Sequence, residues 1–149
     1  MEYDKEMAAR VWKRVQGSQK PEPPDQAGAL WQMIRQVWQT AMLCGQLARQ
    51  LSGEDRQRVQ TMTRQMQSQL DCLKGIYALQ TGKRPQVSRE PMEQVAPGEL
   101  LRLCYGRIMQ AIARYEAQAE DPEYGRIFRD MSQQAQGHGK LLLEILGRK

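Results

Sequence analysis

The stretch that decides the fold is KRPQVSREPMEQVA, residues 83–96. It is rich in charge and contains Pro85 and Pro91, which is typical of a connection between helices. A helix of about 25 residues is about 37 Å long, whereas about 14 extended residues reach roughly 45 Å. The connection can therefore run the whole length of a helical bundle and begin the next helix at the far end.

Four segments outside this connection have apolar residues at steps of three and four, the period of amphipathic helices. Their inward positions are Leu30, Ile34, Val37, Ala41, Cys44, Ala48 and Leu51 in the first segment; Val59, Met62, Met66, Gln69, Leu73 and Ile76 in the second; Leu101, Cys104, Ile108, Ala111 and Tyr115 in the third; Tyr124, Phe128, Met131, Ala135, His138, Leu142 and Ile145 in the fourth. No useful length of the chain alternates with period two, so no sheet is predicted.

Turn and capping signals separate the segments. Ser52 and Asp55 have the spacing of a capping box at the start of the second helix. Asp25 is predicted to be the N-cap of the first helix and Asp121 the N-cap of the last. The other boundary signals are Gly82, Pro97 and Gly147. The first and third connections are very short, so each predicts an antiparallel hairpin. Together with the long connection they predict an all-α protein, an up-down-down-up four-helix bundle over residues 25–149.

Residues 1–24 precede the bundle. Met7, Val11 and Val15 lie on one side of a short basic amphipathic helix, and a Pro-rich linker follows it. Such a helix could dock on a membrane surface or a partner, or pack on its own bundle. We favour the second interpretation.

Composition narrows the class of protein. With 149 residues, 40 % of them hydrophobic and 26 % charged, the chain has the profile of one soluble domain. No apolar run reaches the ~18 residues of a membrane span, and the amino terminus does not resemble a signal peptide. Three cysteines without a framework spacing favour a reducing cytoplasm. The net charge of +5 reflects Gln in place of Glu, without a run of basic residues, so nucleic-acid binding is not expected.

Several pieces of the chain resemble the rubrerythrin-like bacterial group of the ferritin-like superfamily. LKGIYALQTGK at residues 73–83 resembles the end of that group's second helix. The matching pieces of the second half are LCY at 103–105, YEA at 115–117, DPEYG at 121–125, His138, and LLLEILG at 141–147. The resemblance covers roughly residues 30–149 and implies a ferritin-like four-helix bundle.

The same resemblance implies a centre of two iron or manganese ions. Two helices of such bundles each supply a Glu, and the other two each supply a Glu-x-x-His pair. The corresponding positions here are Met66 and Gln69, Ala135 and His138, Ile108, and either Val37 or Ala41. His138 alone keeps a ligand. Because two hard, doubly charged ions need carboxylates, no cofactor is expected. The alternative is an iron or manganese site built from ligands outside this alignment.

His138 and the cysteines have two interpretations each. The imidazole could be a ligand or proton donor, or a core histidine hydrogen-bonded to Gln69 or Tyr115. Cys44 and Cys104 could form a redox pair or a soft metal site with His138, or be small buried hydrophobes. We favour the structural interpretation for all three residues. Gly137 and Gly139 flank the histidine and either admit a neighbouring helix or loosen the turn.

The sequence therefore predicts a non-catalytic bundle, a structural or protein-interaction module that we expect to be a homodimer or to bind another protein. The alternative is a rubrerythrin-like di-iron oxidoreductase or iron-binding protein acting on peroxide or in metal homeostasis, although the chain has no CxxC pair for a rubredoxin-type iron centre. Trp31 and Trp38, at i and i+7, either mark a dimer surface or widen the core stripe.

Overall fold

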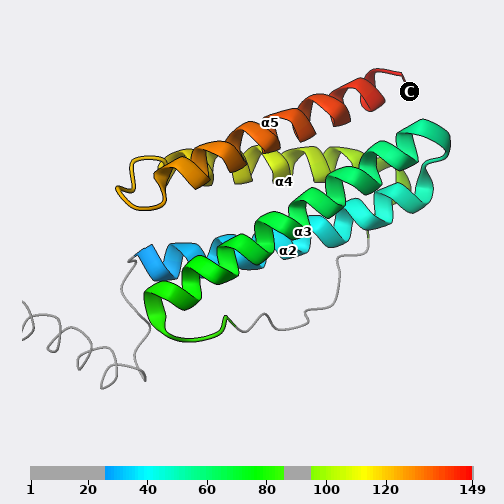
Figure 1. Cartoon of the computed structure of the whole chain (residues 1–149). Coiled ribbons are helices and arrows are strands. Elements are labelled where there is room, and N and C mark those ends of the chain that lie inside the picture. Colours follow the sequence, from blue (N-terminus) through cyan, green and yellow to red (C-terminus); the bar gives the residue numbers. More distant parts are fainter. Residues whose placement is uncertain (1–25, 86–94, 149) are drawn as a thin grey trace, which may run out of the picture.

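The described part of the chain consists of four long helices (Figure 1). The computed structural model describes residues 26–85 and 95–148. The helices are α2 (Gln26–Gln50), α3 (Gly53–Thr81), α4 (Pro97–Ala117) and α5 (Gly125–Gly147), and no strand occurs within those ranges. The prediction of an all-α protein with four helices is confirmed. The predicted N-terminal helix and its linker, residues 1–24, and the cap Asp25 lie outside the described residues.

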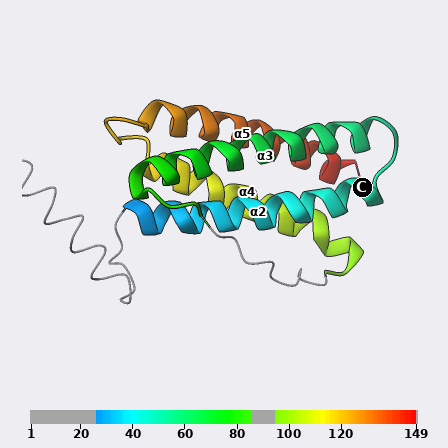
Figure 2. The ribbon, with the colours of Figure 1, turned by 60° about the horizontal axis from the view of Figure 1, so that its bottom comes forward.

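The four helices pack side by side in two orientations. Figures 1 and 2 show α2 and α5 running in one direction and α3 and α4 in the other. The tightest pairs are α2 with α3 and α4 with α5, and α2 also packs on α4. The approach between α3 and α5 is looser. The end of α3 and the start of α4 lie at opposite ends of the bundle.

The predicted inward positions form the core. All of them are buried except Ala111 and Tyr124, which are half-buried. Four polar side chains share this interior: Thr40, Gln69, Ser132 and His138. The three- and four-residue spacing therefore identified the correct face of every helix.

The helix boundaries agree with the sequence at some ends and differ at others. Gly82 ends α3 in the left-handed conformation (φ 71°) and donates its N–H to Ala78, as its position suggests. Ser52 is the N-cap of α3, but its side chain makes no capping hydrogen bond, so the capping box does not form.

The prediction of Asp121 as the N-cap of the last helix was wrong by one turn. The carboxylate accepts hydrogen bonds from the backbone N–H groups of Glu123 (2.9 Å) and Tyr124 (2.7 Å). These bonds stabilise a turn ahead of α5, which begins only at Gly125. The aspartate found its usual backbone donors, but in a turn rather than a helix.

Two glycines of α5 stand at points of close approach. A β-carbon on Gly139 would lie 2.6 Å from the terminal methyl of Met109 on α4, the far end of a flexible side chain that would have to move aside. A β-carbon on Gly125 would overlap the backbone carbonyl of Ala119. Gly137, by contrast, has open space around it.

The outer surface of the described residues carries few large apolar side chains. Met42, Leu79 and Leu143 are exposed, and they stand on three different helices. Trp38 packs against the core, and the guanidinium of Arg35 lies 5.8 Å from the ring centre of Trp31. Within the described ranges, the apolar stretches of the helices all fall short of what crossing a membrane requires.

Candidate functional site

A small cavity lies between the four helices. It is lined by Val37 and Thr40 of α2, Met66 and Gln69 of α3, Ile108, Ala111 and Tyr115 of α4, and Ala135 and His138 of α5. Its volume of about 10 Å³ for the centre of a water-sized sphere is the space of one water molecule. Every described helix contributes to this one place.

The cavity brings together the positions that the resemblance assigned to metal ligands. Met66, Gln69, Ile108, Ala135 and His138 all line it. Of the two alternatives on the first helix, Val37 lines the cavity, whereas Ala41 is buried outside its lining. The sequence did not identify Thr40 as part of the site. The helical spacing could have identified it, because Thr40 lies one turn from Val37 on the inward face of α2.

Gln69 is the centre of a short hydrogen-bond chain. Tyr115 Oη donates to Gln69 Oε1 at 2.8 Å, and Gln69 Nε2 donates to Gln134 Oε1 at 2.6 Å. Burial raises the pKa of the Tyr115 hydroxyl, which is therefore protonated and can donate. Both polar atoms of the Gln69 amide are satisfied, so this amide stabilises the core.

The partner predicted for His138 was wrong. The imidazole Nε2 lies 2.7 Å from Gln65 Oε1, and Gln69 pairs with Tyr115 and Gln134 instead. Gln65 stands one turn before Gln69 on the same side of α3, so the sequence offered two equivalent amides. Since an amide oxygen only accepts, Nε2 carries the hydrogen.

His138 is a neutral imidazole with one unused nitrogen. Burial lowers its pKa to about 4, well below the usual 6.5. Nδ1 is buried without a hydrogen-bond partner among the described residues. The residue combines an uncharged ring, one firm hydrogen bond and one unshared lone pair.

Cys44 and Cys104 meet across α2 and α4, each one turn from a residue of the cavity. Both side chains are fully buried, hydrogen-bonded to each other and not joined by a disulfide. The hydrogen bond with Cys104, together with burial, raises the pKa of the Cys44 thiol. A buried thiol that keeps its proton is a poor nucleophile. Cys72 is half-buried on α3, apart from this pair, and burial raises its pKa as well.

The donors around the cavity do not fit a pair of iron or manganese ions. Such ions require several carboxylates, and the nine lining residues include no Asp or Glu. The available donors are one imidazole, one amide and two hydroxyls, and the amide is already engaged on both sides. Nowhere in residues 26–85 and 95–148 do three His, Cys, Asp or Glu side chains gather as metal ligands would.

Comparisons of the chain with protein-family models, with curated proteins and with solved structures found no match.

Proposed function

We propose that this chain is a ferritin-like, rubrerythrin-related bundle whose metal pair has been replaced by apolar and amide side chains. It acts as a non-catalytic structural or protein-interaction module in the cytoplasm, as a homodimer or bound to another protein. The observation that carries the proposal is the cavity, where six positions assigned to ligands converge without a carboxylate.

The directions of the helices support the ferritin-like part of the proposal. In an up-down-down-up bundle the second and third helices are parallel and need a long crossover. Here α3 and α4 are parallel, and the end of one lies far from the start of the other. A plain up-down-up-down bundle would have these two helices antiparallel.

The packing supports the loss of the metal pair. Met66, Ile108 and Ala135 take the positions of carboxylates, and all three are buried among other apolar groups. A well-packed apolar interior stabilises a fold at least as well as buried charges do. The bundle therefore needs no ion to offset charge in its centre.

Elemental analysis tests the proposal. Protein produced in medium rich in iron and manganese is purified without chelator, and metal content is measured beside an optical spectrum. We expect neither metal in stoichiometric amount and the same thermal midpoint after treatment with EDTA. About two ions per chain, removed by chelation together with peroxidase activity, would instead establish the oxidoreductase alternative.

A rebuilt site tests the alignment independently. The variant Val37→Glu, Met66→Glu, Gln69→His, Ile108→Glu, Ala135→Glu, with the native His138, restores the full ligand set of the resemblance. We expect it to bind two Mn²⁺ ions and to gain thermal stability from them. The matched control moves one carboxylate a turn away, with Ile112→Glu in place of Ile108→Glu, and should bind Mn²⁺ more weakly. Equal binding by the two variants would contradict the ferritin-like alignment.

A further inference from the structure

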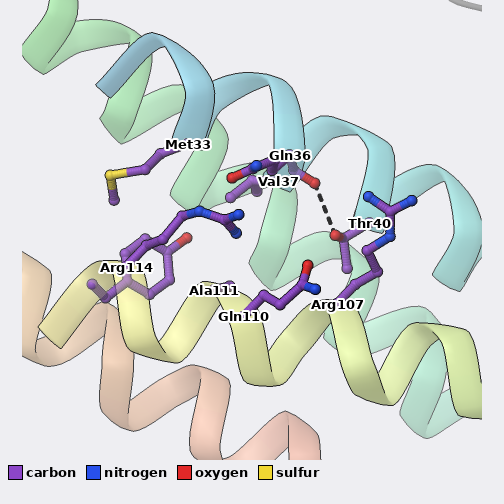
Figure 3. A pocket seen from close by; sticks show the side chains of 9 residues that line it. Met33, Gln36, Val37, Thr40, Arg107, Gln110, Ala111 and Arg114 are labelled. Carbon is purple, nitrogen blue, oxygen red and sulfur yellow. Dashed lines mark hydrogen bonds between the residues drawn. The ribbon is translucent and has the colours of Figure 1, made fainter. Parts of the chain in front are cut away.

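A second cleft lies on the outer side of the α2/α4 pair and is strongly basic. It is lined by Met33, Gln36, Val37 and Thr40 of α2 and by Arg107, Gln110, Ala111, Arg114 and Tyr115 of α4. Four of these residues, Val37, Thr40, Ala111 and Tyr115, also line the central cavity. Figure 3 shows the Arg114 guanidinium and the Gln110 amide reaching from α4 toward α2. Apolar side chains form the floor, and two arginines stand two turns apart along one wall.

Arg114 is a cation without a counter-charge in this cleft. No described residue hydrogen-bonds or forms an ion pair with its guanidinium, although that group has five N–H donors. Partial burial and the nearby charge of Arg107 both act against its protonated form, lowering its pKa. Guanidinium nevertheless remains charged in proteins. The positive charge of Arg114 is therefore not neutralised by any described residue.

Gln36 supplies a second unsatisfied group. Its backbone carbonyl accepts a hydrogen bond from Thr40 Oγ1 at 2.8 Å, but its side-chain Oε1 is buried without a partner. A buried amide oxygen without a hydrogen-bond partner destabilises the folded state. Rotation of the side-chain amide by half a revolution about its last C–C bond exchanges the oxygen with the NH₂ group, and the two groups occupy nearly the same volume. Gln36 can thus present a donor to a ligand held by Arg114.

We propose that the α2/α4 cleft is a binding site for a carboxylate group, with Arg114 and the Gln36 amide as its hydrogen-bond donors and Arg107 adding positive charge. A planar carboxylate matches the fork of a guanidinium. This inference is independent of the proposed function, because it holds whether or not the central cavity binds metal.

The dimensions of the cleft limit how a ligand can bind. The cleft leaves about 10 Å³ for the centre of a water-sized sphere, the space of one water molecule, as the central cavity does. Only the carboxylate end of a ligand can therefore approach Arg114, and the rest of the ligand stays outside the cleft. A tetrahedral phosphate is bulkier than this planar group. The carboxylate can belong to a small organic acid or to a glutamate of an acidic peptide.

NMR titration of the full chain tests the site. The Arg Nε–H and Gln side-chain signals are followed while sodium acetate replaces sodium chloride at pH 6.5 and constant ionic strength. A second arm uses a capped peptide with one Glu, and a third uses the same peptide with Gln. We expect saturable shifts of the Arg114 and Gln36 signals with acetate and with the Glu peptide. The Gln peptide should produce none.

Two variants with the same loss of charge complete the test. Arg114→Gln removes the proposed donor, and we expect it to weaken binding by roughly tenfold or more. Arg102→Gln removes an exposed cation from the same helix and should bind like the native chain. If the Glu peptide binds more tightly than acetate, the source of the carboxylate is a peptide. If acetate binds more tightly, the source is a small organic acid. Equal weakening of binding by both variants, or equal shifts with the Glu peptide and the Gln peptide, would each overturn the proposal.

Discussion

The central cavity and the α2/α4 cleft adjoin each other, share Val37, Thr40, Ala111 and Tyr115, and differ mainly in their charge. Gln69 in the cavity has both ends of its amide paired, whereas Gln36 in the cleft has a buried oxygen without a partner. The imidazole of the cavity is neutral, whereas the cleft holds two arginines. Each region also holds one buried polar atom without a hydrogen-bond partner among the described residues, His138 Nδ1 in the cavity and Gln36 Oε1 in the cleft. The difference between them is therefore one of charge, and the positive charge makes the cleft the better candidate for binding an anion.

The largest expected effect comes from placing the same carboxylate in the two regions. Ile108→Glu buries a charge without a partner, so we expect the free energy of unfolding to fall by about 3–5 kcal/mol. Gln110→Glu places its charge within one turn of Arg107 and Arg114 and should stabilise the helix by a few tenths of a kcal/mol. Urea denaturation at pH 7 measures both. Similar effects from the two substitutions would remove the contrast between cavity and cleft.

The next effect is the pH dependence that His138 contributes. Its pKa is about 4 in the folded protein and 6.5 in the unfolded chain, so the unfolded chain binds the proton first as pH falls. The contribution to stability is complete above pH 6.5 and decreases by about 3 kcal/mol as pH falls to about 4. His138→Gln should lose correspondingly less stability over this range. Parallel pH profiles for the two proteins, from chemical denaturation, would show that the imidazole is not held neutral.

A smaller effect is expected from Tyr115→Phe. The substitution leaves Gln69 Oε1 buried without its donor, which should lower the free energy of unfolding by about 1–3 kcal/mol. The double variant Tyr115→Phe, Gln69→Leu removes both partners and should recover part of this loss. A double-variant cycle by urea denaturation measures the coupling. Strict additivity would mean that the hydrogen bond contributes nothing.

The smallest effect is expected in the cleft. Arg114→Gln removes a partly desolvated cation that Arg107 repels, so we expect a slight gain in stability without ligand. Because the group is largely solvated and screened, the gain should be a few tenths of a kcal/mol. Calorimetry at low salt, with Arg102→Gln as the control, measures the change in thermal midpoint. A clear loss of stability would show that Arg114 supports the fold.

Periodicity predicted the core because burial depends mainly on which face of a helix a residue occupies. Thr40 and Gln69 follow the same rule as their apolar neighbours, since their positions decide their burial. The level of the cavity along the bundle could not come from periodicity alone. It came from the resemblance, which aligned Met66, Ile108 and Ala135 at one height.

Hydrogen-bond partners and charged clefts were harder to predict. Gln65 and Gln69 are chemically identical and one turn apart, so only side-chain conformation decides which of them pairs with His138. In the sequence, the spacing of Arg107 and Arg114 is that of an ordinary solvated helix face. They line one cleft with Gln36 only because of the way α2 and α4 pack against each other. The turn at Asp121 was misassigned because an aspartate caps turns and helices with the same backbone bonds.

The position of Gly139 has a consequence for its neighbour His138. A β-carbon at position 139 would meet the terminal methyl of Met109 at 2.6 Å, and beyond it the Tyr105 ring and Ile108 at 3.7 and 3.9 Å, all from α4. Only the Met109 methyl would have to move, and it is the far end of a flexible side chain. A small residue at position 139 could thus be accommodated with the imidazole still beside its glutamine.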